Sequence, residues 1–311
     1  MSVKSYNKNP VVLVTGANGF LGKNLLRELL SQQKKIIAVC NNLDLEFSTD
    51  QNVEWIRPEG RTPLELENEL RDKCISCIYH LAWSGTSGEN RANYNVQIEN
   101  IRMSCDYVIL SSRIGCKRFI YASSINEIET YEYLQLNDVQ PGGGYIYGTA
   151  KLAAHLMAEV VAKQNNIDFI PCLITNIFGV GEKSARLIND SVRKLYNGEH
   201  CAFSSGNQTY DFIYITDAVA SIVAVGDKGK GFTQYYIGSG NPKPLKEFLL
   251  EMRDIVSPNT EIGLGELPFN SKDIDYSQFN CKQVEEDTGY INKISFKFGI
   301  NLLLESIQHE K

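Results

Sequence analysis

Apolar residues along the first 180 positions alternate between short continuous runs and longer segments with helical spacing. The short runs predict buried strands of a parallel sheet, because a strand covered on both faces lacks regular polar positions. These predicted strands are 11–15, 36–40, 77–82, 119–123 and 169–175. Between them, apolar residues recur every three or four positions, which predicts helices at 23–32, 95–114 and 147–164.

Strands that alternate with helices predict crossover units and a doubly wound α/β fold, with helices on both faces of a parallel sheet. After Gly179 the pattern changes to short apolar pieces separated by prolines and glycines, which is typical of a smaller, loop-rich lobe. The apolar stretch 212–238 indicates one return to the sheet. We therefore predict one domain of residues 1–175 and 211–240, and a second lobe of residues 176–210 and 241–311.

The segment between the first predicted strand and helix reads TGANGFLG. Here the backbone must turn sharply, approach a pyrophosphate closely and let the helix pack against the strand, and glycine permits all three. The helix N-terminus adds partial positive charge. The pattern predicts a Rossmann-type dinucleotide site, with a tight turn that binds no ligand as the alternative. The predicted contacts are Gly16, Asn18, Gly19, Phe20, Leu21 and Gly22.

The end of the second predicted strand bears on the choice between NAD and NADP. An acidic residue there would bind the ribose hydroxyls of NAD, and an arginine would favour the 2′-phosphate of NADP. The strand ends in Cys40, Asn41 and Asn42, and the nearest carboxylate is that of Asp44. The sequence therefore leaves the cofactor open between NAD and NADP, with Asn41 as a predicted contact.

Composition and charge narrow the range of partners. Hydrophobic residues make up 43% and charged residues 22% of the 311 positions, as in globular proteins, and the net charge of −6 argues against nucleic-acid binding. The polar start MSVKSYNKNP and the lack of an apolar run near the roughly 20 residues of a membrane span favour a cytoplasmic protein without membrane contact. Cys74 and Cys77 form an isolated C-x-x-C pair, for which we expect small core residues rather than a redox or metal site.

The segment YIYGTAK carries a candidate acid–base pair at the start of a predicted helix. Tyr147 has Lys151 four positions later, whereas Tyr145 has Thr149 at that spacing. Residues i and i+4 share one helix face, so only Tyr147 can act together with the lysine. A free tyrosine has a pKa of about 10, and a nearby ammonium would favour its phenolate form. The alternative is a tyrosine packed at a helix start beside a solvated lysine.

Taken in order, VTGANGFLG, IYHLAW, RFIYASS and YGTAK resemble the extended short-chain dehydrogenases/reductases, and most closely their nucleotide-sugar epimerases, dehydratases and reductases. The resemblance covers nearly the whole chain. It implies that Tyr147 transfers a proton, that Lys151 also binds the nicotinamide ribose, and that Ser124 hydrogen-bonds the substrate oxygen. Strand alternation and the family's spacing favour Ser124 over Ser123 for this role.

The resemblance implies further contacts on both sides of the site. On the cofactor side these are Leu81, Ala82 and Asn100, together with Tyr147 and Lys151. On the sugar side they are Trp83, Ser124, Asn176, Arg186, Tyr210 and Lys272. Asn100 and Trp83 could equally be core residues. Two arginines of resembling proteins are absent here, one of them replaced by Tyr210, so the candidate cations for a diphosphate are Lys183, Arg186 and Lys272, each of which could instead be a solvated surface residue.

We therefore predict an NAD- or NADP-dependent reductase or dehydrogenase that acts at ring C4 of a nucleoside-diphosphate sugar. Resembling dehydratases carry an Asp-Glu pair after the catalytic hydroxyl, and Ile125 and Asn126 stand there instead, which disfavours dehydration. A 4-epimerase is the neighbouring alternative, because it needs the same residues and a rotation of the sugar. A non-catalytic dinucleotide sensor or scaffold is the alternative of another class, although it would need only the glycine loop.

The resemblance also implies a homodimer formed by the helices at 95–114 and 147–164. Both segments carry apolar residues on more than one face. The residues expected at this interface are Ile98, Ile101, Val108, Leu152, Leu156 and Val160. In this interpretation the first domain binds the dinucleotide and the second lobe binds the nucleotide sugar.

Overall fold

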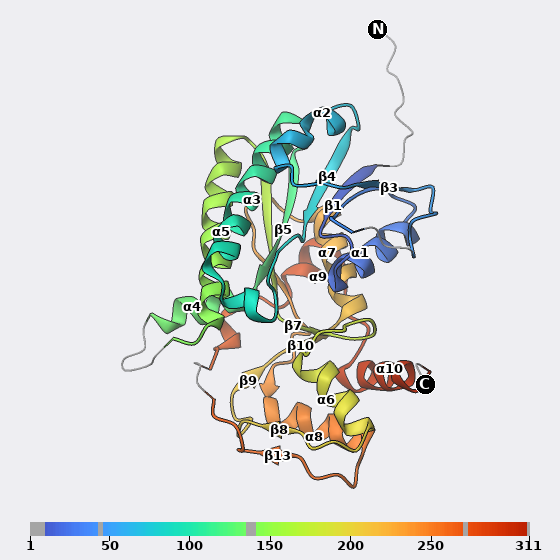
Figure 1. Ribbon diagram of the computed structural model, residues 1–311, viewed down its shortest axis with the longest axis vertical. Coiled ribbons are helices and arrows are strands. Elements are labelled where there is room, and N and C mark those ends of the chain that lie inside the picture. Colours follow the sequence, from blue (N-terminus) through green and yellow to red (C-terminus); the bar gives the residue numbers. More distant parts are fainter. Residues whose placement is uncertain (1–9, 43–45, 135–140, 270–272, 310–311) are drawn as a thin grey trace.

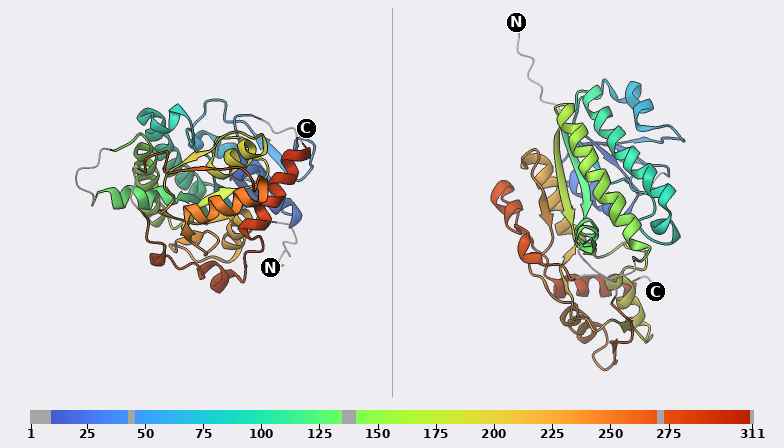
Figure 2. Two further views of the ribbon diagram at one scale, coloured as in Figure 1. Left: turned by 90° about the horizontal axis from the view of Figure 1, so that it is seen from below. Right: turned by 90° about the vertical axis from the view of Figure 1, so that its left-hand side faces the viewer.

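The computed structural model describes residues 10–42, 46–134, 141–269 and 273–309. A larger lobe is built around one parallel sheet, and a smaller lobe of short strands and helices lies at one end of it (Figure 1). The views in Figure 2 show helices on both sides of the sheet. The predicted doubly wound α/β fold is therefore confirmed.

The main sheet has seven parallel strands in the order β11-β6-β5-β4-β1-β2-β3. Five of them lie where the apolar runs predict strands. The runs do not indicate β3, because it has four residues and only the first and last of them are buried. The strands are β1 Val11–Thr15, β2 Lys35–Val39, β3 Val53–Ile56, β4 Ile75–His80, β5 Arg118–Ser124, β6 Asp168–Ile174 and β11 Tyr235–Ile237.

Two pairs of helices cover the two faces of the main sheet. On one face α1 (Phe20–Ser31) packs against α7 (Ile215–Lys228), and on the other α3 (Tyr94–Arg113) packs against α5 (Gly144–Gln164). Each pair buries its apolar stripe against the sheet, which gives one hydrophobic cluster per face. Within the described part of the chain, no helix is long and apolar enough to cross a bilayer.

The order of the strands reverses at β1, which creates a crevice. From β1 the chain adds β2 and β3 on one side, and β4, β5 and β6 on the other. Loops that leave the carboxyl ends of neighbouring strands diverge at such a point, and open α/β sheets bind ligands there. The glycine loop follows β1, Trp83 lies in the loop after β4, and Ser124 is the last residue of β5, so the topology brings these predicted site residues to one edge of the sheet.

Directly after β5 the chain forms α4 (Ile125–Tyr133), which the apolar pattern does not indicate. Ser124 is its N-cap, and the backbone N–H of Ser124 donates a hydrogen bond to Glu127 at 3.2 Å. This reciprocal arrangement is a capping box, and the letters S-I-N-E contain its signature. The turn into α4 therefore fixes the backbone of Ser124 at the end of the strand.

The smaller lobe is built from paired short strands and three helices. Its strands are β7 Asn176–Phe178 with β10 Phe212–Tyr214, β8 Ala202–Phe203 with β13 Gly263–Leu264, and β9 Thr209–Tyr210 with β12 Lys243–Pro244. Its helices are α6 Leu187–Tyr196, α8 Leu245–Val256 and α10 Phe296–His309. The remaining short elements are η1 Pro63–Leu66, α2 Glu67–Leu70, η2 Glu89–Ala92, η3 Tyr276–Gln278 and α9 Gln283–Thr288.

The predicted return of residues 212–238 to the main sheet is only partly right. The strand β11 joins the sheet beside β6, but β10 pairs with β7 in a separate two-stranded sheet, and α7 lies between the two. Both segments are short and apolar, so hydrophobicity alone does not tell which sheet each one joins. The division into domains stays a prediction.

An apolar surface lies on the outer side of α3 and α5, and we call it the α3–α5 apolar face. Each of its five residues is at least 50% exposed: Tyr94, Ile98, Leu156, Met157 and Val160. Three of these were expected at a dimer interface. The expectation for Val108 is wrong, because this residue is fully buried in the core of the protomer.

We expect the α3–α5 apolar face to be covered by a second copy of the chain. Light scattering at micromolar concentration should give twice the protomer mass of 34.9 kDa. Leu156→Glu should give the protomer mass, because a charge cannot be buried unpaired in an apolar interface. Phe298→Glu changes an equally exposed apolar residue on α10 and should leave the dimer intact. A wild-type mass of 34.9 kDa would contradict the prediction.

Candidate active site

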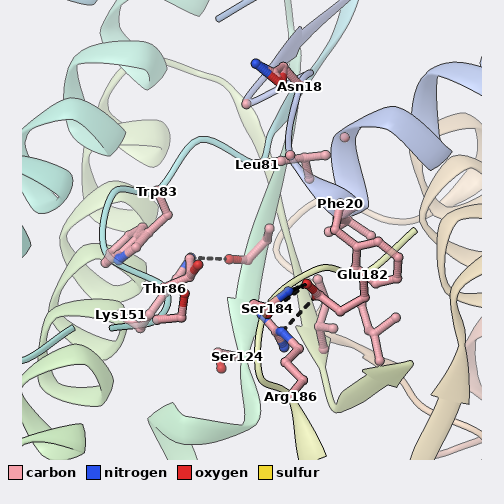
Figure 3. Close-up of a pocket in the computed structure, with 18 of the residues that line it drawn as sticks. Asn18, Phe20, Leu81, Trp83, Thr86, Ser124, Lys151, Glu182, Ser184 and Arg186 are labelled. Atoms are coloured by element: carbon pink, nitrogen blue, oxygen red, sulfur yellow. Dashed lines mark hydrogen bonds and ion pairs between the residues drawn. The ribbon is translucent and has the colours of Figure 1, made fainter. Parts of the chain in front are cut away.

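A cavity of about 510 Å³ lies at the crevice that the sheet topology creates. The glycine loop forms one part of its wall, and the ends of β5 and α5 form another (Figure 3). Thirteen predicted site residues line it: Gly16, Asn18, Gly19, Phe20, Leu21, Gly22, Asn41, Leu81, Trp83, Ser124, Tyr147, Lys151 and Arg186. Of the described residues that were also predicted, five are not part of the lining: Ala82, Asn100, Asn176, Lys183 and Tyr210. Lys272 lies outside the described residues.

The three glycines of the loop have different physical roles. Gly16 has φ +68°, and a Cβ there would lie 2.7 Å from the backbone nitrogen of Ala82. A Cβ on Gly22 would overlap the carbonyl of Gly16, so this glycine lets α1 pack against the loop. Gly19 has an ordinary φ of −74°, and a Cβ there would meet only the Gly16 oxygen, at 3.4 Å. The lack of a side chain at Gly19 is therefore needed to leave space in the cavity, and it is not needed for the fold.

At the far end of the loop, the cavity is lined by the polar residues that follow β2. Asn18 donates a side-chain hydrogen bond to the carbonyl of Asn42 at 3.0 Å, and the Cys40 thiol donates to the same carbonyl at 2.8 Å. The described residues that directly follow β2 and line the cavity are Cys40, Asn41 and Asn42, and none of them is acidic or cationic. Asp44 lies outside the described residues, so the choice between NAD and NADP stays open.

The hydroxyl of Ser123 gives a separate indication that the cavity takes a ligand. The residue lines the cavity, and its side-chain oxygen is buried with no hydrogen-bond partner among the described residues. A buried hydroxyl without a partner is unfavourable, and a polar ligand would supply one. Together with the glycine wall, this residue fits a cavity that holds an elongated polar molecule such as a dinucleotide.

Lys151 is buried beside the ends of β4 and β5. Its ammonium donates a hydrogen bond to the carbonyl of Ala122 at 2.7 Å and lies 3.8 Å from the ring centre of Trp83. Burial lowers the pKa of Lys151 to about 7, while the negative charge of Glu127 acts in the opposite direction. The lysine is therefore a readily titrated group at neutral pH, and Figure 3 shows it beside Trp83 on the cavity wall.

Tyr147 stands one helical turn before Lys151, and only 7% of it is exposed. Burial raises the pKa of Tyr147, whereas the Arg91 guanidinium and a hydrogen bond with Ser124 lower it. The Cζ atom of Arg91 lies 4.0 Å from the centre of the Tyr147 ring. Ser124, Tyr147 and Lys151 thus meet at one wall, as the resemblance implies for a catalytic set.

The loop after β4 is held by amide side chains of α3. The side chain of Asn100 accepts from the Ser84 N–H at 2.9 Å and donates to the Ser84 carbonyl at 2.8 Å. Gln97 accepts from the indole N–H of Trp83 at 2.8 Å. Ala82 is fixed by its own N–H, which donates to Thr15 at 3.1 Å. Asn100 and Ala82 therefore shape the cavity through the backbone, and a direct contact with the cofactor stays a prediction.

Among the described residues, the side of the cavity nearer the smaller lobe carries one cation. Arg186 lines the cavity and pairs with Glu182 at 3.1 Å, and Ser184 donates to the same carboxylate at 2.7 Å (Figure 3). Asn176 donates to the carbonyl of Asp211 at 3.3 Å. The ring of Tyr210 stacks on Phe212 rather than lining the cavity, with ring centres 5.6 Å apart.

Sequence reasoning assigned no role to Arg91, Gln97, Glu182 or Glu129. For Gln97 a signal exists, because Gln97, Asn100 and Ser104 follow helical spacing and all three are buried. A polar stripe on the buried face of a helix indicates side chains that hold a neighbouring loop. Arg91 lies in the four-residue helix η2 and Glu182 lies in a loop, and neither is long enough for spacing to predict contacts.

Comparison with known proteins gives consistent findings. The sequence profile described as the NAD dependent epimerase/dehydratase family matches residues 12–238. The chain is 22% identical to CDP-abequose synthase of Salmonella typhimurium, over 95% of this chain and 98% of that protein. It is also 22% identical to dTDP-4-dehydro-6-deoxyglucose reductase of Escherichia coli, over 96% of this chain and 97% of that protein.

A solved structure of UDP-N-acetylglucosamine 4-epimerase from Bacillus cereus superimposes with a TM-score of 0.76 and 18% identity. The superposition covers 96% of this chain and 97% of that chain. At this level of identity the likeness shows a shared fold, and the fold extends over both lobes.

Gly19→Val should abolish dinucleotide binding while the protein stays folded, because the new side chain would occupy cavity space and strain no backbone. Calorimetric titration with NAD and with NADP measures the binding, and thermal unfolding checks the fold. Gly22→Val is the contrasting variant and should lower thermal stability, because its Cβ overlaps the Gly16 carbonyl. Unchanged affinity of Gly19→Val for both cofactors would show that the loop does not hold a dinucleotide.

Proposed function

Because the chain belongs to the NAD dependent epimerase/dehydratase family, we propose that it is an NAD(P)-dependent reductase or dehydrogenase acting at ring C4 of a nucleoside-diphosphate sugar. Membership of the family confirms the predicted resemblance, the predicted class of enzyme and the predicted nicotinamide cofactor. The position of the reaction on the sugar, the roles of individual residues and the identity of the substrate belong to the proposal.

The observation that carries the proposal is the meeting of three groups at one cavity. Ser124 comes from the end of β5, and Tyr147 and Lys151 come from the first turns of α5. All three line the cavity whose other wall is the glycine loop. A dinucleotide held by that loop would place its reactive ring beside a phenol, a hydroxyl and an ammonium.

Each residue has a role that follows from its contacts. NAD(P) supplies or accepts the hydride when it is bound. The Tyr147 hydroxyl gives a proton to the oxygen that becomes an alcohol, or takes it in the reverse direction. Ser124 orients that oxygen by a hydrogen bond, and its own hydroxyl already contacts Tyr147. Lys151 contributes positive charge and donors for ribose hydroxyls, and Arg186 is the described cation at the wall nearer the smaller lobe.

Two observations favour oxidation or reduction at C4 over dehydration. The relative named dTDP-4-dehydro-6-deoxyglucose reductase takes, by its name, a sugar that carries a carbonyl at C4. Ile125 and Asn126 follow Ser124 where resembling dehydratases have a pair of acids. The side chain of Asn126 is hydrogen-bonded to Ser124 and Arg91, and an amide supplies no acid.

The direct test offers CDP-, dTDP- and UDP-linked 4-dehydro-6-deoxy sugars together with NADH or NADPH. We expect the absorbance of the reduced nicotinamide to fall with at least one pair, and mass spectrometry to show a product that has gained two hydrogen atoms. Interconversion of two sugars without net use of the cofactor would favour the 4-epimerase. Dinucleotide binding without turnover of any of these sugars would favour a sensor or scaffold and contradict the proposal.

Tyr147→Phe removes only the hydroxyl, so it should leave the fold and cofactor binding nearly unchanged. General acid–base catalysis contributes typically about 10²–10⁴-fold, and the rate of turnover should fall by that order. Tyr145→Phe is the matched control, because Tyr145 packs against Tyr133 and has no lysine on its helix face. Full activity of Tyr147→Phe together with loss of activity in Tyr145→Phe would contradict this assignment.

A further inference from the structure

Arg91 lies against the ring of the proposed acid–base residue and is fixed there by hydrogen bonds. Its Cζ atom is 4.0 Å from the centre of the Tyr147 ring. One terminal nitrogen donates to the carbonyl of Thr86 at 2.8 Å, and the other donates to the side-chain oxygen of Asn126 at 3.1 Å. The planar guanidinium therefore keeps one face free for the ring, as in a cation–π contact.

The segment that carries Arg91 is held by hydrogen bonds from α3 and by close packing against the start of α5. Gln97 donates to the carbonyl of Asn90 at 3.0 Å and to that of Gly85 at 3.1 Å. A Cβ on Gly143 would lie 2.9 Å from the side chain of Ala92, so this glycine permits the close approach of the loop to α5. The position of Arg91 is therefore set by packing and does not depend on a ligand.

Asn126 joins Arg91 to the proposed catalytic hydroxyl. Its side-chain oxygen accepts from Arg91 and, at 3.3 Å, from the hydroxyl of Ser124. Its side-chain nitrogen donates to the carboxylate of Glu129, which fixes the orientation of the amide. The oxygen of Ser124 also accepts from the backbone N–H of Asn126 at 3.3 Å, so Asn126 fixes the position of this hydroxyl.

The other charged groups near Tyr147 are weaker or more distant sources of positive charge. Lys151, on the same helix, has a pKa lowered to about 7 by burial, so it carries only part of a charge at neutral pH. Arg186 is almost half exposed and pairs with Glu182. From α4, the carboxylate of Glu127 disfavours ionisation of Tyr147.

Arg91 has the largest charge effect on Tyr147, and it lowers the pKa of the phenol that burial raises. A guanidinium stays protonated over the whole range in which enzymes work. Its attraction to an aromatic ring grows when the ring becomes a phenolate, because the ring then carries negative charge.

We propose that Arg91 is a positioning residue that favours the phenolate form of Tyr147 through its contact with the tyrosine ring. The inference rests on the proposed function, since it gives Tyr147 the acid–base role. In this proposal the segment after β4, which carries Arg91, influences the proton transfer by Tyr147. Neither the spacing of residues nor the glycine loop indicates this role.

The test measures the ionisation of Tyr147 without any sugar. The protein is labelled with ¹³C at the ζ carbon of tyrosine, and the Tyr147 resonance is the one missing from Tyr147→Phe. Titration with saturating NAD⁺ then gives the ratio of phenolate to phenol at each pH. In Arg91→Gln this ratio should be about tenfold lower at a given pH, which is a rise of about one unit in the pKa.

Two further variants separate charge from structure. Arg91→Lys keeps a positive charge but loses the planar face and one of the two hydrogen bonds, so its ratio should lie between those of wild type and Arg91→Gln. Arg71→Gln removes an arginine that pairs with Glu67 away from the site and should titrate like wild type. If Arg91→Gln does not fold, Arg91→Lys alone tests the proposal. A ratio of phenolate to phenol in Arg91→Lys equal to that of wild type then overturns it.

A ratio in folded Arg91→Gln equal to or above that of wild type overturns the proposal, as does a wild type that forms no phenolate while it remains folded. Where a sugar is turned over, the high-pH limb of the reduction rate should move to higher pH in Arg91→Gln, because Tyr147 holds its proton longer. If no nucleotide sugar is turned over, the proposed function fails, while the NMR titration still decides the effect of Arg91.

Discussion

The buried ammonium group of Lys151 is the constraint on which the arrangement of the site depends. A cation removed from water is unfavourable unless dipoles or aromatic rings replace the solvent. Here β5 supplies the carbonyl of Ala122, the loop after β4 supplies the ring of Trp83, and α5 supplies the ammonium. Each of these three elements is thereby fixed relative to the other two, and the cavity lies where they meet the glycine loop.

The buried side of α3 gives up apolar packing to hold that loop in place. Gln97, Asn100 and Ser104 replace the apolar residues expected on a helix face that packs against a sheet. Their polar groups are hydrogen-bonded, so the cost of burying them is largely offset. These side chains also position the loop after β4, because they hydrogen-bond directly to the backbone of Ser84 and to the indole of Trp83. The shape of the cavity therefore depends on a helix that contributes no side chain to its lining within the described residues.

The parts of the site that the sequence predicts are those in which a local rule sets the geometry. The spacing of Tyr147 and Lys151 is a property of a single helix turn, and the glycine loop is a property of one strand, one turn and one helix. Helical spacing also shows that α3 has apolar residues on more than one side. It does not tell which side faces the core. Val108 is therefore expected at the dimer interface, although it is buried in the core of the protomer. The contact of Arg91 with Tyr147 joins a loop to a distant helix, so it depends on tertiary packing that no local pattern encodes.

The electrostatics of the site follow from its burial. Burial raises the pKa of Tyr147 and lowers the pKa of Lys151. Both shifts oppose the pair of a phenolate and an ammonium. The more deeply the site is buried, the less effectively a lysine alone can stabilise the phenolate. A guanidinium keeps its charge after partial burial, because its unperturbed pKa is far above neutral pH. A shielded acid–base tyrosine therefore gains most from an arginine that is held outside the cavity and against the ring, which is where the loop after β4 holds Arg91.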